Sequence, residues 1–166
     1  MHISQLNHLW SPVAVGFSAL VACALVSCDR GPDKSTSATS PTPSAVVKVE
    51  GGALNKFFPK DEGEYDVVFT SEKVGYAEAK LEKDGDELGT LAVSDQAGNA
   101  DVLSNYNSAT KKIGGFPSIT RGSKGTAVLA GRFQVQVRST SDALSAADRE
   151  AWLQKFDLAG LSSLAK

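Results

Sequence analysis

The residues best suited to nucleophilic, redox or metal chemistry all lie at the start of this sequence. Both histidines, His2 and His8, and both cysteines, Cys23 and Cys28, fall within the first 28 of its 166 residues. After Cys28 the sequence contains neither an imidazole nor a thiol. Ser–His and Cys–His nucleophilic sites, zinc sites built from His or Cys, and dithiol redox chemistry are therefore excluded from the rest of the chain. Proton transfer there would depend on Asp, Glu, Lys or Tyr.

Partial matches to known sites occur later in the sequence. Ser108 and Lys111 form an S-x-x-K, but the Ser-Asp-Asn and Lys-Thr-Gly triplets that accompany it in penicillin-binding proteins are absent from the sequence. The acidic run Asp84–Glu87 lacks the twelve-residue pattern of a calcium loop and predicts a hairpin turn. A second acidic loop contains Asp95, Asn99 and Asp101, and it predicts a helix cap at Asn99 or Asp101. We therefore predict no metal site and no bound cofactor.

Composition limits the class of protein and of partner. Hydrophobic residues make up 42% of the chain and charged residues 22%, as in a globular domain. The length allows one domain with extensions but not two ordinary domains. The formal net charge is −2, whereas a nucleic-acid-binding protein needs a concentrated positive face. A nucleic-acid partner is therefore not expected.

The amino-terminal segment has the pattern of an export signal. From Val13 to Val26 the chain runs for 14 residues without a charge. A membrane-spanning helix needs about 20 such residues, whereas the apolar region of a secretory signal has about 7–15. The tetrapeptide Leu25-Val26-Ser27-Cys28 follows, with an aliphatic residue three positions before the cysteine and a small residue directly before it.

In these residues the sequence resembles a bacterial lipoprotein signal peptide with its lipobox. The resemblance implies that residues 1–27 are cleaved off and that the sulfur of Cys28 carries a diacylglyceryl group. It also implies that the new amino terminus is acylated, so that fatty-acid chains hold the protein on the extracytoplasmic, periplasmic side of the cell membrane. In enteric-type lipoproteins an Asp directly after the cysteine favours retention in the inner membrane, and Asp29 occupies that position.

Two alternatives stay open at this end of the chain. A second lipobox-like match ends at Cys23, but cleavage there would leave an apolar tripeptide beside the anchor. An uncleaved helix from about Leu9 to Ser27 would instead anchor the chain end in the membrane. Cys28 is preferred because the polar chain starts immediately after it.

A tether and one domain are expected to follow the signal. Between positions 32 and 44, ten of thirteen residues are Pro, Ser or Thr. Such a segment buries too little apolar surface to offset its ordering entropy, so residues 28–52 are predicted to be the lipidated cysteine and a disordered tether. Residues 53–166 are predicted to form the folded domain.

Hydrophobic periodicity in residues 53–166 predicts three helices and two sets of three strands in the order α-βββ-α-βββ-α. A short helix around Leu54–Phe58 comes first, and Val102–Tyr106 supplies the second. Ser145 and Asp148 resemble a capping box that opens the third, and Leu158, Leu161 and Leu164 continue its apolar face to the end of the sequence. The strands are expected at 65–70, 77–82, 88–94, 113–121, 125–130 and 132–138. Hairpin-linked strands form antiparallel sheets, so we expect an α+β domain whose sheet of about six strands is covered by helices. This architecture resembles that of small extracytoplasmic lipoprotein domains.

These features predict a membrane-anchored binding or assembly module rather than an enzyme, with an envelope protein as a candidate partner. Trp152 and Phe156 of the carboxy-terminal helix are expected to cover the sheet; were any surface to recognise a protein, they would be its best aromatic anchors. The alternative is a carboxylate-dependent hydrolase of an envelope glycan. Its acids would be Asp61, Glu62, Glu64 or Asp66, since a glycosidase needs only two carboxyl groups.

Overall fold

A single antiparallel sheet of seven strands organises the part of the chain that the computed structural model describes, residues 47–165. Across the sheet the strands follow the order β1-β2-β3-β7-β6-β5-β4. Each strand pairs with a neighbour in sequence except at the centre, where β3 pairs with β7. The strands are β1 (Tyr65–Lys73), β2 (Tyr76–Lys83), β3 (Asp86–Asp95), β4 (Lys111–Ile113), β5 (Phe116–Arg121), β6 (Gly125–Ala130) and β7 (Phe133–Ser139).

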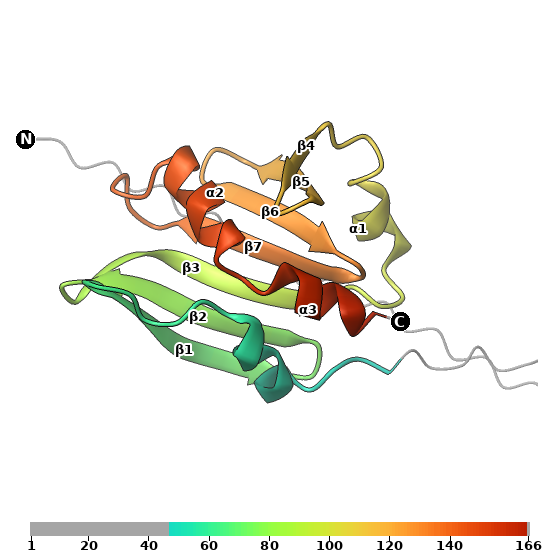
Figure 1. The fold of residues 1–166 in the computed structure, drawn as a ribbon, viewed down its shortest axis with the longest axis horizontal. Helices are drawn as coiled ribbons and strands as arrows, with labels where there is room; N and C mark the ends of the chain where they lie inside the picture. Colours follow the sequence, from blue (N-terminus) through green and yellow to red (C-terminus); the bar gives the residue numbers. More distant parts are fainter. Residues whose placement is uncertain (1–46, 166) are drawn as a thin grey trace, which may run out of the picture. The chain divides into compact units, whose positions relative to one another are not determined.

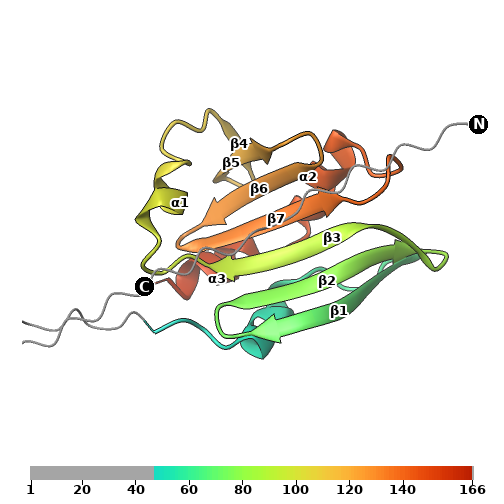
Figure 2. The same ribbon diagram turned by 180° about the vertical axis from the view of Figure 1, so that it is seen from behind.

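Helical segments cover one face of this sheet. The segments on this face are η1 (Gly51–Phe57), a 3₁₀ helix, and the α-helices α2 (Ala146–Gln154) and α3 (Leu158–Ser163); the remaining helix, α1 (Ala100–Ser104), has no buried residue. In Figure 1, α2, α3 and η1 lie in front of the strands, and Figure 2 shows the same strands from behind with α2 and α3 on the far side. The expected α+β domain with an antiparallel sheet is thus observed. Among the described residues no helix is long and apolar enough to cross a membrane.

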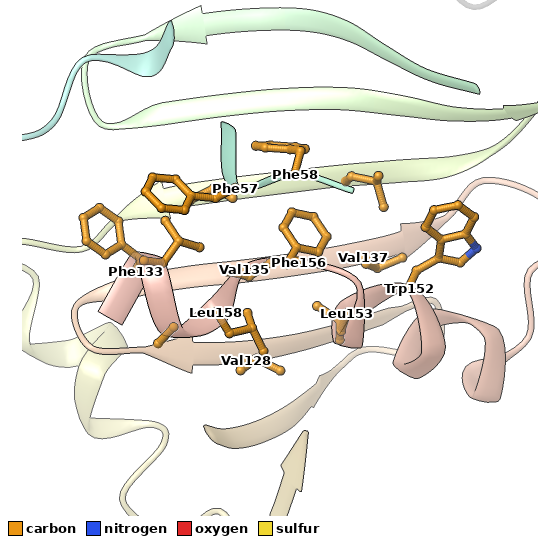
Figure 3. Packing of buried hydrophobic residues seen from close by; sticks show 14 of the residues in the cluster. Phe57, Phe58, Val128, Phe133, Val135, Val137, Trp152, Leu153, Phe156 and Leu158 are labelled. Carbon is orange, nitrogen blue, oxygen red and sulfur yellow. The ribbon is translucent and has the colours of Figure 1, made fainter. Parts of the chain in front are cut away.

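The core lies between the sheet and these helices. The inward positions of β2 are Ala77, Ala79 and Leu81, each fully buried, and they alternate with Glu78 and Lys80. In β7 the inward positions Phe133, Val135 and Val137 are fully buried, as the sequence pattern predicts, but Gln134 between them is also buried and accepts a hydrogen bond from the Tyr106 hydroxyl. Figure 3 shows the aromatic and aliphatic side chains that meet them from the helical layer, including Phe57, Phe58, Trp152, Leu153, Phe156 and Leu158.

The sheet has seven strands rather than about six because the predicted strand at 113–121 is interrupted. Gly114 and Gly115 adopt φ values of 58° and 87°, in the left-handed region that glycine enters without a Cβ penalty. They form a turn that pairs Ile113 with Phe116, so β4 and β5 are two strands of a hairpin. The glycine pair is therefore the turn of a hairpin and not part of one continuous strand.

The carboxy-terminal apolar segment also divides into two helices. Asp157 caps the second helix, with its carboxylate accepting a hydrogen bond from the backbone N–H of Gly160 at 2.8 Å. The break reorients the chain so that Leu153 from α2 and Leu158 and Leu161 from α3 are all buried in the same core. The apolar residues expected on one continuous helix are therefore carried by two short helices at an angle, α2 and α3.

The capping box predicted at the start of α2 is present. Ser145 Oγ accepts from the backbone N–H of Asp148, and the Asp148 carboxylate accepts from the backbone N–H of Ser145 at 2.9 Å and from its hydroxyl at 2.6 Å. Hydrogen bonds from the Ser145 side chain and then from its backbone lower the pKa of Asp148. A carboxyl group with a lowered pKa stabilises the fold at pH values above its unfolded pKa, and this contribution is lost as the pH falls through the folded pKa.

The Ser145→Ala variant is therefore expected to lose about 1 kcal/mol of unfolding free energy at neutral pH, the usual cost of removing an N-cap hydroxyl. The difference from wild type should shrink as the pH falls from about 4 through the lowered folded pKa of Asp148, because below that pKa the carboxylate is protonated in both folded and unfolded chains. Urea unfolding at a series of pH values measures this. The Asp148→Asn variant is the control, because it should lack the acid-dependent part. A Ser145→Ala difference that stays constant with pH would contradict the assignment.

Candidate functional site

Positively charged side chains gather at the end of the sheet where β5 turns into β6. The turn is Gly122-Ser123-Lys124, with Gly122 at a φ of 64°. An open hollow of about 620 Å³, called here the first hollow, lies against this turn. Its lining residues are Thr120, Arg121, Gly122, Ser123, Lys124 and Arg138.

Strand register explains why two arginines meet in the first hollow. Gly125 is paired with Arg121 on one side and with Arg138 on the other, so the two arginines flank a residue that has no side chain. A Cβ atom at Gly125 would lie 2.6 Å from the carbonyl oxygen of Arg121. The glycine therefore permits the close approach of the strands at this position. Among residues 47–165, neither arginine has a carboxylate within ion-pair distance.

A second hollow of about 260 Å³ lies at the same end of the sheet and shares Ser123 and Lys124 with the first. Its other lining residues are Ser139, Ser141, Asp142, Leu144, Ser145 and Arg149. Arg149 projects from α2 and is only 5% exposed. The four cations Arg121, Lys124, Arg138 and Arg149 are referred to below as the cationic end.

Neutral groups supply all the described hydrogen bonds of Arg149. Its Nε donates to Thr126 Oγ1 at 3.2 Å, one terminal nitrogen donates to Ser139 Oγ at 2.8 Å and to the carbonyl of Leu144, and the other donates to the carbonyl of Ser123 at 3.4 Å. No carboxylate of residues 47–165 forms an ion pair with this guanidinium. A buried cation without a counter-ion is unfavourable in itself.

The acidic residues near the cationic end are few and mostly engaged elsewhere. Asp142 lies 3.4 Å from Lys124 Nζ, but its side chain is 99% exposed, so water screens this pair strongly. Asp148 is held in the capping box, and Glu150 pairs with Lys111 at 2.5 Å. The local charge at both hollows is therefore positive although the whole chain is slightly acidic.

The carboxylates considered for a hydrolase have structural contacts. Asp61 Oδ1 accepts the backbone N–H of Val67 at 2.8 Å, and the backbone of Glu62 bridges to that of Tyr65. Both contacts lie along the free edge of β1. There they pair backbone groups of the strand that would otherwise be open to solvent or to another chain. The Glu62 carboxylate also pairs with Lys155, and Glu64 pairs with Lys83 at 3.0 Å. Three of the four acids therefore have a structural partner within the domain.

The other partial motifs are placed as follows. Ser108 lies in the turns after α1 rather than at a helix start, and Lys111 is paired with Glu150. Asp84-Gly85 forms the β2–β3 turn, with φ values of 53° and 85°. Asn99 caps α1 through its side chain. Among the described residues, no group of three or more His, Cys, Asp or Glu side chains is arranged to hold a metal ion.

Trp152 and Phe156 are part of the core. They are 5% and 4% exposed, and Trp152 packs edge-on against Tyr65 with ring centroids 5.4 Å apart. The prediction that these rings cover the sheet thus matches their burial, and they present almost no surface to a partner.

The residues of the predicted lipid anchor, Cys28, Asp29 and the alternative Cys23, lie outside the described residues.

Comparison with known proteins adds nothing to these observations. No family model, curated protein or solved structure compared with this chain matches it.

Proposed function

We propose that this protein is a lipid-anchored, non-catalytic binding module on the extracytoplasmic side of a bacterial membrane. The lipobox-like Leu25–Cys28 and the following Pro-, Ser- and Thr-rich segment support the location. Two or more acyl chains would hold the protein stably, since each buried methylene contributes about 0.8 kcal/mol. The binding role is supported by the described domain, whose most distinctive surface is the cationic end.

One observation carries the binding role: the cationic end lies opposite the end where the described chain begins. Val49 is held there by two hydrogen bonds: its backbone N–H donates to the Asp95 carboxylate at 3.1 Å, and the backbone N–H of Gly75 donates to its carbonyl. Asp95 pairs with Phe133 across β3 and β7, whereas Gly89 pairs with Ser139 at the far end of the same strands. Figure 1 shows residues 47–50 leaving beside α3 and the β5–β6 turn at the other end. A module tethered at the first end would leave its cationic hollows free.

The location is tested with the Cys28→Ser variant. Wild-type protein is expected to sediment with membranes, and its intact mass should equal that of residues 28–166 plus one diacylglyceryl group and one amide-linked acyl group. The variant should lose the lipid and retain the mass of residues 1–27. The Cys23→Ser variant is the matched control and should be processed like wild type. A wild-type polypeptide that begins at Met1, or that carries a free thiol at position 28, would refute the proposed anchor.

A further inference from the structure

We infer that the second hollow binds the phosphate group of a ligand, with Arg149 and Lys124 as its charged contacts. This inference rests on the proposed function, since it names the ligand class of the proposed binding module. The hollow presents more hydrogen-bond donors than the described residues supply acceptors for.

Arg149 has one more donor than it has described acceptors. A guanidinium carries five N–H groups, and four contacts to neutral oxygens are present, of which those to Leu144 and Ser123 are long, at 3.4 Å. The group is 5% exposed and lines the hollow, so its positive charge lies beside a space of limited volume. An oxyanion in that space would supply both the missing acceptor and the missing counter-charge.

Other lining groups add donors, and the hollow is also lined by one carboxylate, the exposed Asp142, which lies 3.4 Å from Lys124 Nζ. Ser141 Oγ is buried and has no hydrogen-bond partner among the described residues. Ser123 adds a hydroxyl, and Lys124 adds an ammonium that is half exposed. A planar carboxylate would match one arginine through two oxygens, whereas a tetrahedral phosphate has oxygens enough for the guanidinium, the ammonium and a hydroxyl together. The set of donors therefore favours a phosphate.

The amino terminus of α2 is not counted among these donors, because its N–H groups at Ser145 and Asp148 are already bonded within the capping box. The first hollow extends the positive surface on the other side of the shared residues Ser123 and Lys124. Arg121 and Arg138 there would attract an anionic ligand and contact the part of it that extends beyond the phosphate.

Calorimetric titration of the full chain with inorganic phosphate, in an uncharged detergent at low ionic strength, tests this inference. Saturable binding is expected, and the Lys124→Gln variant should weaken it about tenfold, as expected for one charge-assisted hydrogen bond. Lys73→Gln is the matched control, since Lys73 is exposed and lies at the opposite end of the sheet. Arg149→Met should abolish binding. Lys124→Gln decides the outcome because Lys124 is at the surface, whereas Arg149 also joins α2 to β6 and β7.

The result that would overturn the inference is an absence of saturable phosphate binding, or an equal affinity in the Lys124→Gln and Lys73→Gln proteins. Equal binding of chloride at the same ionic strength would overturn it as well.

The source of the phosphate is distinguished by a second titrant, glycerophosphoglycerol, the deacylated headgroup of phosphatidylglycerol. Tighter binding of this diester assigns the site to a lipid headgroup, and tighter binding of inorganic phosphate assigns it to a small soluble phosphate. Neither titration depends on the anchor, so a failed Cys28 experiment and a failed phosphate experiment are separate results.

Discussion

The Asp95→Ala variant is expected to lose at least about 3 kcal/mol of unfolding free energy, the lower end of the cost of breaking a buried ion pair. The Asp95 carboxylate is fully buried, and it accepts hydrogen bonds from three donors: Arg132 at 2.9 Å, the backbone N–H of Val49 at 3.1 Å and that of Ala97 at 3.0 Å. Removing it would leave all three donors without this acceptor. Arg132 would lose its only described carboxylate while its side chain stays only 27% exposed.

The effect should be local as well as global. Arg132 also donates to the carbonyl of Val47, so the Asp95–Arg132 pair holds the first described residues against the sheet. In the Asp95→Ala protein, trypsin should therefore cleave after Lys48 faster than in wild type under native conditions. Denaturant unfolding gives the stability and limited proteolysis gives the release of the segment.

Asp142→Ala is the matched control for Asp95→Ala. It also removes an aspartate from an ion pair, but its side chain is 99% exposed. The expected change in unfolding free energy is within about 0.5 kcal/mol, as for other exposed pairs. If the two variants unfolded at the same denaturant concentration, the buried pair would not have the role assigned to it.

The contrast between these two aspartates shows which features the sequence could predict. Strand alternation in β2 and β7, the β2–β3 turn and the caps at Asn99 and Ser145 depend on residues close together in the chain, and the sequence predicted all of them. Asp95 was interpreted as part of an acidic loop, because its neighbours in sequence are polar. Its partners Val49 and Arg132 are 46 and 37 residues away, and no local pattern indicates such pairing.

The cationic end was missed for the same reason. Arg121 and Arg138 come together only because β6 separates β5 from β7 and places Gly125 between them. Arg149 lies in a predicted amphipathic helix, where a charged residue is expected to face solvent. It is buried because Thr126 and Ser139, on the two strands beneath α2, offer hydroxyls to it. The one available signal was the spacing of basic residues on either side of a Gly-Ser-Lys-Gly turn, which the sequence alone could not assign to one surface.

The second large effect is expected at a glycine. A Cβ atom at Gly51 would lie 2.5 Å from the backbone nitrogen of Lys73, 2.5 Å from its carbonyl oxygen and 2.5 Å from the carbonyl oxygen of Tyr76. Lys73 and Tyr76 are paired across the β1–β2 hairpin, so all three atoms belong to a hydrogen-bonded backbone that cannot move independently. The Gly51→Ala variant must therefore shift η1 away from the hairpin. We expect a loss of about 3 kcal/mol in unfolding free energy, at the upper end for overpacking.

The adjacent Gly52 provides the control, because the same substitution in the same 3₁₀ helix meets different surroundings. A Cβ atom there would have only the Glu72 carboxylate within 4 Å, at 3.2 Å, and a flexible side chain can move aside. Gly52→Ala should therefore be neutral, or stabilising by about 0.5 kcal/mol through the lower entropy of the unfolded chain. Thermal and urea unfolding of the two variants test the close packing of η1 on the hairpin. Equal stabilities would mean that η1 is not held against β1 and β2 at this distance, and that Leu54 and Phe57 are placed in the core by other contacts.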